Sequence, residues 1–475
     1  MNGRQMGARL SAGFAVSLLA ACTTGPNYHR PAIAAPATFR GAEPGPAPQP
    51  LSVADLKWFE IFKDEKLQEL VRTALAQNYD LRDAVARVEA ARANLGIARS
   101  AQFPQASAGG AVNIERLSRD GATPIPPALL ASQNRNWGEA SLSLLSFEVD
   151  LWGRLRRSTE AARANLLSAD ENRKAVVTTL ISDVATAYMS LRELDNELEI
   201  SERTLATRKE SLELTRLRQG GGVATLLDLR QAEQLVYTAT ATIPAIEQQI
   251  EQTENNISLL LGKAPAGVIR GRGLTQQELP PSVPAGLPSA LLDRRPDIRE
   301  AEQNLIAANA QIGVAKAAYF PQVSLTGFLG GQSTQLASLF SGPQSAWNFA
   351  PQVTQPIFAA GRIKSGVRLA EAGRDSALSQ YDKAIQTAFT EVSNALIAHQ
   401  RVRESRVQQE ALVAALRDRE RLAYVRYRGG VDTQLNALDA DRDLFQAEVA
   451  LSQIQLNEVL SVVQLYKALG GGWQQ

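Results

Sequence analysis

The chain contains one phrase twice, and this repeat limits the possible folds more than any other feature. Phe-Pro-Gln occurs at residues 103–105 and again at 320–322, and the segments 78–110 and 295–327 agree at fourteen of thirty-three positions without a gap. Shared helix composition does not place a helix-ending proline at the same phase in two segments. A second ungapped register pairs Gly221-Gly222-Val223 with Gly429-Gly430-Val431. The sequence therefore predicts a tandem duplication.

Length and composition exclude some classes of protein. A chain of 475 residues with 44% hydrophobic content can bury more than one core. Its 50 basic and 49 acidic residues leave a net charge of +1, which gives no electrostatic footprint for nucleic acid. The longest apolar run, from Leu10 to Ala21, is shorter than the roughly 20 residues that a membrane-spanning helix needs. We expect neither a nucleic-acid partner nor a transmembrane helix.

The N-terminus has the pattern of a bacterial secretory signal peptide. Two arginines precede the apolar run, and the run leads directly into the single cysteine, Cys22. The tetrad Leu19-Ala20-Ala21-Cys22 resembles a lipobox, in which the processed cysteine carries acyl chains. An ordinary signal peptide with a cysteine nearby is the alternative, although a lone exported cysteine cannot form an internal disulfide. We expect a signal peptide over 1–21, a lipid on Cys22 and a proline-rich tether within 22–60.

Each copy contains a predicted helical hairpin, over 154–261 in the first and 362–469 in the second. Residues 154–219 contain neither Gly nor Pro, and their apolar residues recur every seven positions, which is typical of a coiled coil. The members of this seam are Val184, Leu191, Leu198, Leu205 and Leu212. A helix of this length would reach roughly 100 Å, several times the thickness of a bilayer core, so it must project into water. A solvated coiled-coil rod is the ordinary use of such a pattern.

Four segments between the helices alternate between polar and apolar residues, as strands do. They cover 103–117, 137–152, 323–331 and 347–358, and they predict β-hairpins over 103–152 and 320–358. The phase of the alternation flips within 137–152, which indicates a bulge or an exit from the sheet. Four strands cannot close a barrel, and open edges are not tolerated in lipid. Several chains must therefore pool their strands, and this argument allows a dimer or any larger ring.

The pattern divides the chain into five segments and offers little support for catalysis. The segments are 1–21, the tether 22–60, a first repeat over 61–273, a linker over 274–290 and a second repeat over 291–475. The two histidines, His29 and His399, lie far apart, and neither a metal-ligand spacing nor a nucleophilic triad is present in the sequence. We expect no enzymatic activity, no metal and no cofactor apart from the lipid. An envelope enzyme with an unrecognised site is the third functional hypothesis.

Five phrases resemble the TolC-type outer-membrane efflux channels, specifically their lipoprotein branch. These phrases are SFEVDLWGR (146–154), RRPDIR (294–299), ANAQIG (308–313), QPIF (355–358) and RYRGGV (426–431). The resemblance covers essentially the whole mature chain. It implies a mixed α and β membrane protein: a homotrimer with a twelve-stranded β-barrel in the outer membrane and an α-barrel of long antiparallel helical hairpins in the periplasm.

The resemblance also implies a function and partners. Such a channel is a passive duct for drugs or other small molecules, which a periplasmic adaptor protein and an inner-membrane RND-type pump deliver to it. A periplasm-spanning structural lipoprotein without a pore is the alternative.

In this family the tunnel closes at the hairpin tips farthest from the barrel. The matching phrases imply an inward-facing carboxylate at Asp439, an apolar constriction at Leu435, and residues that tie the tips together at Tyr427 and Arg442, with Asp228 as their partner. Without the resemblance, Asp439 and Arg442 are expected to form an i,i+3 surface ion pair. A second acidic ring is in doubt, because Asn436 stands where some members carry Asp.

The glycine-rich tips have two compatible interpretations. Glycine commonly caps a helix in the left-handed conformation, and the resemblance implies that the exposed tips dock the adaptor. The tip residues are Gly220, Gly221, Gly222, Val223, Gly429, Gly430 and Val431.

Overall fold

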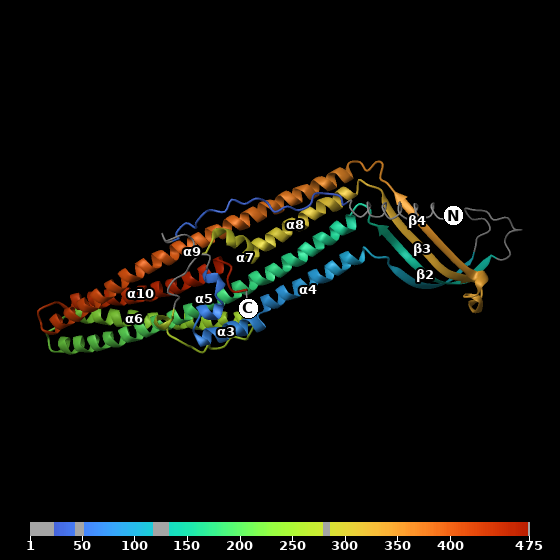
Figure 1. Cartoon of the computed structure of the whole chain (residues 1–475). Coiled ribbons are helices and arrows are strands. Elements are labelled where there is room, and N and C mark those ends of the chain that lie inside the picture. The colour runs from blue at the N-terminus through green and yellow to red at the C-terminus, as the bar shows by residue number, and fades with distance from the viewer. Residues whose placement is uncertain (1–22, 43–51, 117–132, 279–285, 474–475) are drawn as a thin grey trace. The chain divides into compact units, whose positions relative to one another are not determined.

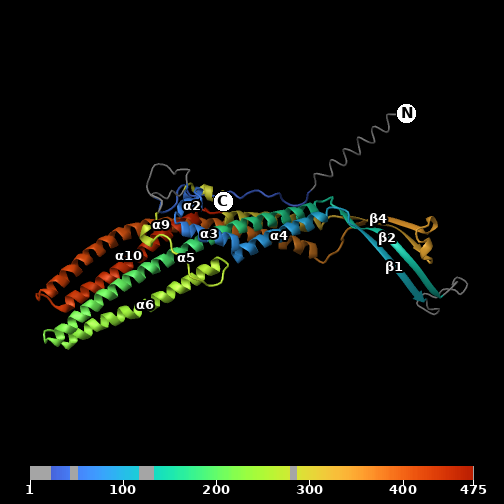
Figure 2. The ribbon, with the colours of Figure 1, turned by 90° about the horizontal axis from the view of Figure 1, so that it is seen from below.

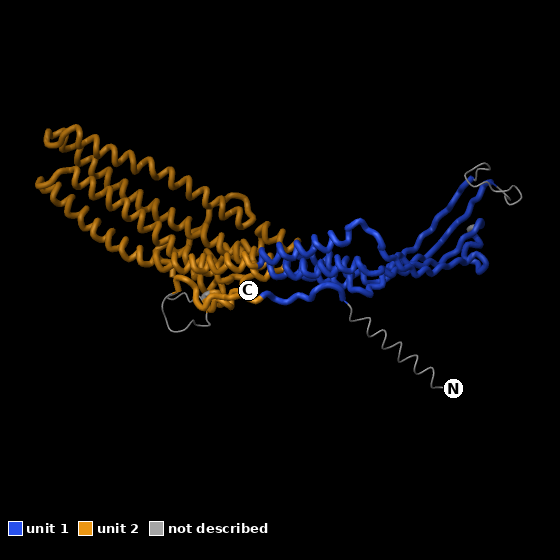
Figure 3. The backbone as a smooth tube through the Cα atoms, turned by 90° about the horizontal axis from the view of Figure 1, so that it is seen from above, with its two compact units in different colours: residues 1–31, 88–168, 301–381 blue, residues 32–87, 169–300, 382–475 orange. Residues whose placement is uncertain are grey.

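The computed structural model describes residues 23–42, 52–116, 133–278 and 286–473, so the expected signal peptide and Cys22 lie outside the described residues. The chain divides into two compact units, which Figure 3 shows in different colours. Unit 1 comprises residues 1–31, 88–168 and 301–381, and unit 2 comprises residues 32–87, 169–300 and 382–475.

Figure 1 shows the order of the elements along the chain. The helices are α2 (Trp58–Ile61), α3 (Glu65–Gln77), α4 (Tyr79–Ser100), α5 (Arg154–Gly220), α6 (Leu226–Leu260), α7 (Leu291–Arg294), α8 (Pro296–Ala317), α9 (Arg362–Arg428) and α10 (Gln434–Ala468). The strands are β1 (Ala106–Arg116), β2 (Asn134–Val149), β3 (Gln322–Ser333) and β4 (Ser345–Thr354).

The two copies of the duplication have helices of equal length. Both α4 and α8 contain 22 residues, both α5 and α9 contain 67, and both α6 and α10 contain 35. Figure 2 shows α6 returning beside α5 and α10 returning beside α9. In the described part of the chain, every helix is too short or too polar to cross a membrane.

The strands form one antiparallel sheet in the order β1-β2-β3-β4. The phase flip predicted a bulge or an exit from the sheet. The register between β2 and β3 shifts between Leu144 and Phe147 and pairing then resumes, so the irregularity lies within the sheet. The fourth strand ends at Thr354, before the predicted end at Phe358. Both edge strands, β1 and β4, have an outer edge without a partner strand in the described chain.

The predicted apolar seam holds for only part of α5. Val184 and Leu191 are fully buried, whereas Leu198, Leu205 and Leu212 are only half-buried. Toward the C-terminal end of α5, the residues that are buried at helical spacing are instead polar. They are Ser201, Thr204, Arg208, Ser211 and Thr215. The prediction was wrong there because α10 presents buried polar side chains to this part of α5.

The shorter helices of each copy meet end to end within unit 2. The side chain of Asn78, just before α4, donates a hydrogen bond to the Leu260 carbonyl of α6 (2.9 Å) and accepts one from the Leu81 N–H (2.9 Å). At the equivalent position of the second copy, Arg295 donates to the Ala468 carbonyl of α10 (2.9 Å). Each side chain therefore satisfies a terminal helix carbonyl that has no partner within its own helix.

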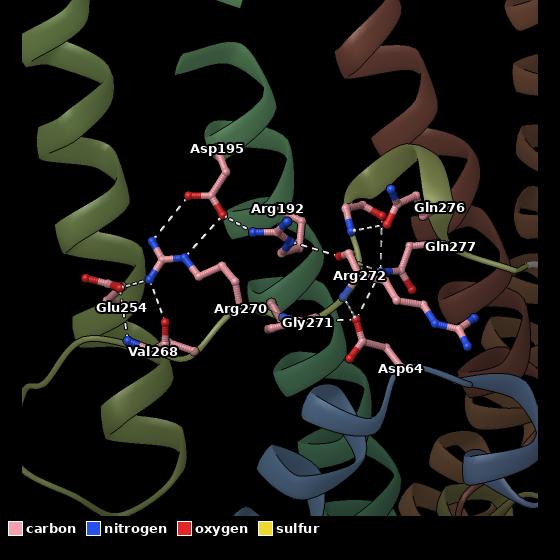
Figure 4. Close-up of polar contacts among 12 residues, drawn as sticks. Asp64, Arg192, Asp195, Glu254, Val268, Arg270, Gly271, Arg272, Gln276 and Gln277 are labelled. Carbon is pink, nitrogen blue, oxygen red and sulfur yellow. Dashed lines mark hydrogen bonds and ion pairs between the residues drawn. The ribbon is translucent and has the colours of Figure 1, made fainter. Parts of the chain in front are cut away.

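A polar network fixes the segment that follows α6 (Figure 4). Arg270 forms ion pairs with Asp195 of α5 and Glu254 of α6. Asp64 caps α3 and accepts hydrogen bonds from the Gln277 side chain (3.1 Å) and from the backbone N–H of residue 272 (2.9 Å). Burial favours a higher pKa for Asp64, but these hydrogen bonds outweigh burial and lower its pKa. The network holds the start of the linker against the helices of unit 2.

The first described residues pack against unit 1. The N–H and the hydroxyl of Thr24 both donate to the Trp152 carbonyl at 2.9 Å, and the Arg157 side chain donates to the Thr24 carbonyl at 3.1 Å. Gly25 lies directly on Gly313 of α8, where a Cβ on Gly25 would come within 2.5 Å of the Gly313 Cα. This backbone contact is possible only because both residues are glycine.

The duplication supplies a matched pair of substitutions that tests this contact. A Cβ on Gly313 would lie 2.6 Å from the Thr24 carbonyl oxygen, whereas a Cβ on Gly96, the equivalent position in the first copy, meets nothing within 4 Å. We expect Gly96→Ala to stabilise the fold by about 0.5–1 kcal/mol. We expect Gly313→Ala to destabilise it by about 1–3 kcal/mol and to speed amide exchange at residues 23–28. Thermal unfolding and hydrogen exchange would measure both effects, and equal shifts in the two variants would contradict the docking.

Candidate functional site

The two hairpin turns close in the same way. In the first, the Val223 N–H donates to the Arg218 carbonyl (2.9 Å); in the second, the Val431 N–H donates to the Arg426 carbonyl (3.1 Å). The φ angles of the equivalent glycines are +77° at Gly222 and +73° at Gly430. This is the Schellman geometry, in which glycine at the left-handed position ends a helix.

The tips present apolar side chains to solvent. All seven predicted tip residues of the two turns are exposed. Large apolar side chains beside them are also exposed, namely Leu226, Leu227 and Leu435, together with Val223 and Val431 of the turns themselves. Exposed apolar groups clustered at the ends of two hairpins are typical of a surface that binds another protein.

Tyr427 connects the two tips through a residue that the sequence analysis missed. Its side chain is buried, and the guanidinium of Arg218 lies over its ring, 4.6 Å from the centroid. Arg218 belongs to α5 and Tyr427 to α9, so this cation-π contact joins the first hairpin to the second. Basic residues are common in the last turn of any helix, so no sequence signal distinguishes Arg218 for this role.

Within one chain, Asp228 makes a local contact in place of the expected one with Tyr427 and Arg442, and its pairing with a neighbouring copy stays a prediction. Its carboxylate accepts hydrogen bonds from the N–H (2.7 Å) and the hydroxyl (2.8 Å) of Thr225, and the Thr225 hydroxyl accepts from the Asp228 N–H in return. This reciprocal capping box starts α6. Among the described residues, no hydrogen bond or ion pair joins Asp228 to Tyr427 or Arg442. The local helix cap takes the carboxylate that the tip was expected to use.

Three of the five predicted gate residues, Leu435, Asp439 and Arg442, lie on one partly exposed face of α10. Arg442 forms an i,i+3 ion pair with Asp439 (3.1 Å) and a second pair with Asp443 (3.2 Å). Leu435 precedes Asp439 by four residues, about one turn, and is 49% exposed. Within one chain, the surface ion pair expected from spacing alone is therefore present. A ring of Asp439 carboxylates needs neighbouring chains and stays a prediction.

Asn436 has a local reason to replace aspartate. Its amide donates a hydrogen bond to Asp432 (2.6 Å), and Arg426 forms an ion pair with the same carboxylate (3.0 Å). The hydrogen bonds from Asn436 and then from Arg426 lower the pKa of Asp432. An aspartate at position 436 would repel Asp432 and lose this hydrogen bond.

A ladder of polar pairs joins α5 to α10 behind the gate face. We call it the polar seam, and its pairs are Asn196–Ser452 (2.8 Å), Arg203–Glu448 (2.6 Å), Arg208–Asp441 (2.7 Å) and Thr215–Gln434 (2.8 Å). Rising numbers on α5 pair with falling numbers on α10, so the two helices run antiparallel. The polar seam thus connects the first hairpin to the helix that carries the gate residues.

The pair Arg208–Asp441 is the buried centre of the polar seam. The exposed fractions of the two side chains are 4% and 7%. Arg208 also donates to the Leu235 carbonyl of α6 (3.3 Å), and its guanidinium lies 5.2 Å from the centre of the Phe445 ring. Burial raises the pKa of Asp441, although the ion pair with Arg208 opposes this shift. One arginine therefore ties three helices together.

Known proteins are similar to this chain over nearly its whole length. A family model described as outer membrane efflux protein matches residues 70–263 and 287–471. A toluene efflux pump outer membrane protein of Pseudomonas putida, TtgC, is 38% identical over 472 residues, which cover 98% of this chain and 96% of that protein. Outer membrane protein OprJ of Pseudomonas aeruginosa is 37% identical over 462 residues, which cover 96% of this chain and 94% of that protein.

Solved structures are similar over the same extent. The outer-membrane channel OprN superposes with a TM-score of 0.87 at 32% identity, covering 96% of this chain and 100% of that chain. The open state of the MtrE outer membrane channel of Neisseria gonorrhoeae superposes with a TM-score of 0.84 at 33% identity, covering 95% and 99%.

The capping box at the first tip gives a second matched pair of substitutions. Thr225 caps α6 with its hydroxyl, whereas the equivalent Thr433 makes no side-chain cap to α10. We expect Thr225→Ala to cost about 1 kcal/mol of local helix stability and Thr433→Ala to cost almost none. Amide exchange in the first turns of α6 and α10 would measure the difference. Equal effects at both tips would show that the box does not stabilise the first tip.

Proposed function

The chain belongs to the outer membrane efflux protein family, and from this premise we infer that it is the outer-membrane channel component of a tripartite efflux system. It provides a passive duct for drugs or other small molecules, and the inner-membrane transporter provides the energy. The observation that carries this conclusion is the match over nearly the whole chain to proteins named as efflux-pump components and outer-membrane channels. No catalytic step by the chain is part of this function. A structural lipoprotein without a pore is the less favoured alternative.

We propose that the channel is a homotrimer. The sheet has four strands, and the outer edges of β1 and β4 have no partner strand within the described chain. Unpaired backbone groups cost several kcal/mol each in lipid, so the strands of neighbouring copies have to pair with these edges. Three copies would supply twelve strands. The exposed apolar tips support docking of a periplasmic adaptor, through which an RND-type pump would deliver its cargo.

We also propose that Cys22 carries a lipid after removal of residues 1–21. The supporting observation is the position of the residues that follow it. Thr24 is hydrogen-bonded to Trp152, which lies between the end of β2 at Val149 and the start of α5 at Arg154. A lipid two residues before Thr24 would thus be tethered close to the strand-to-helix junction, where a membrane-spanning strand would leave the membrane.

We propose that the exposed face of α10 lines the closed end of the duct. Three copies would bring three Asp439 carboxylates together behind a ring of Leu435 side chains. Like charges in one ring repel each other and attract cations.

Single-channel conductance in planar bilayers tests the duct and the gate together. We expect a small conductance for the wild-type protein and a severalfold larger one for Arg442→Ala, because that variant loses the cation paired with Asp439 and Asp443. Arg421→Ala is the matched control, since it removes another exposed i,i+3 pair, with Asp418. Exposed pairs of this kind contribute less than about 1 kcal/mol, so both variants should fold. Equal conductance in the two variants would refute the gate assignment, and no conductance from folded, inserted wild type would refute the duct.

Intact-protein mass spectrometry tests the anchor. We expect the wild-type protein to begin at residue 22 with the added mass of acyl chains, and Cys22→Ala to lack that mass, because the thiol is the attachment point. Gly96→Ala, which leaves the N-terminal segment untouched, should carry the same lipid as the wild type. An unmodified cysteine in protein purified from membranes would contradict the proposal.

A further inference from the structure

The position of the gate residues depends on how α10 docks against α5. Leu435, Asp439 and Arg442 are partly or fully exposed, whereas Asp441 on the same helix is buried against Arg208. Residues on one rigid helix keep fixed angular and axial offsets from one another. Any rotation or sliding of α10 against α5 would therefore move the gate residues by the same amount.

The docking of α10 changes in chemistry along its length. Toward its C-terminal end its buried side chains are mostly apolar, for example Val462, Val463 and Leu465, which are at most 1% exposed, although Glu458 and Ser461 are buried there too. Apolar packing is non-directional and tolerates small shifts. Along the polar seam, in contrast, each donor meets its acceptor in one register only. A slip of one helical turn, about 5.4 Å, would leave the buried Arg208 and Asp441 without each other.

Arg208 differs from the other cation of the polar seam. The Arg203 side chain is half exposed, and its partner Glu448 forms a second ion pair with Arg417 (2.6 Å). Removing Arg203 would leave Glu448 paired. Asp441 has Arg208 as its one ion-pair partner among the described residues, so removing Arg208 would leave a buried carboxylate without a cation.

We propose that Arg208 is a positioning residue of the gate: by pairing with Asp441 it fixes the register of α10 on α5 and thereby the resting positions of Leu435 and Asp439. The proposal rests on the proposed channel function. Among the described residues, Arg208 forms no hydrogen bond or ion pair with Leu435, Asp439 or Arg442, and the proposal assigns it the role of holding the helix that carries them. The contribution of the pair is specificity of register more than stability, as polar pairs buried in coiled coils can provide.

A set of four proteins tests this assignment: the wild type, Arg208→Met, the matched control Arg203→Met and the double variant Arg208→Met/Asp441→Leu. Arg208→Met leaves a buried charge unpaired, so we expect α10 to shift or detach and the resting conductance to rise severalfold. Arg203→Met should conduct as the wild type does. The double variant removes both buried charges, so we expect it to have wild-type thermal stability. We also expect a raised or broadened conductance, because the buried ion pair that fixes the register of α10 on α5 is gone. Wild-type conductance in a stable double variant would overturn the proposal.

Hydrogen exchange over residues 201–215 and 434–448 supplies a readout that does not need a conducting channel. We expect exchange there to be at least about tenfold faster in Arg208→Met than in Arg203→Met. If the wild type does not conduct, the channel function fails, and the exchange data alone then decide whether Arg208 holds α10. If Arg208→Met does not fold, the double variant decides. Equal exchange in the two single variants would overturn the assignment.

Discussion

The length of α5 and α9 is the constraint on which the rest of the structure depends. Each contains 67 residues, whereas the helices available beside them contain 35 or 22. A long helix can bury its face only if two shorter helices share its length, and their ends must then meet. Helix ends carry unpaired carbonyls and N–H groups, which are costly when they are buried. Asn78 and Arg295 satisfy such groups at the two junctions, one in each copy.

The two copies are equal in geometry and different in chemistry, and the differences carry the specific features. Both hairpin turns close with the same hydrogen bonds, yet only the first has a capping box and only the second has Tyr427 beneath an arginine. The glycine shared by α4 and α8 receives the N-terminal segment only in α8. Duplication thus provides a repeated frame for a symmetric assembly. Substitution within one copy provides the capping box of α6, the arginine contact of Tyr427 and the contact between α8 and the N-terminal segment.

Local rules predict much of this fold from the sequence, and non-local pairing explains the rest. Absence of glycine and proline over 154–219 predicts a long helix, paired glycines predict the tips, and a phase flip predicts the irregularity between β2 and β3. The polar seam escaped prediction because Leu198, Leu205 and Leu212 continue the heptad, while Thr204 and Arg208 have the composition of a solvated face. Burial of Arg208 depends on Asp441, more than two hundred residues away. Likewise the capping role of Asp228 competes with the tip role that resemblance implied, and only the three-dimensional structure shows which contact the carboxylate makes.

The change from mostly apolar to polar packing along α5 and α10 suits the proposed gate, because this end of the channel would have to move for the gate to open. Separating apolar faces costs about 25 cal/mol of free energy per Å² of apolar surface exposed to water. The contacts around Val462 and Val463 therefore oppose separation of the helices at every step. Hydrogen bonds of the polar seam can be replaced by water, so that their net contribution is only about 0.5–1.5 kcal/mol each. A buried pair such as Arg208–Asp441 is different, because it is unfavourable when half broken and acceptable when both partners are hydrated. The polar seam therefore favours two states, docked or fully parted, over the partial displacements between them.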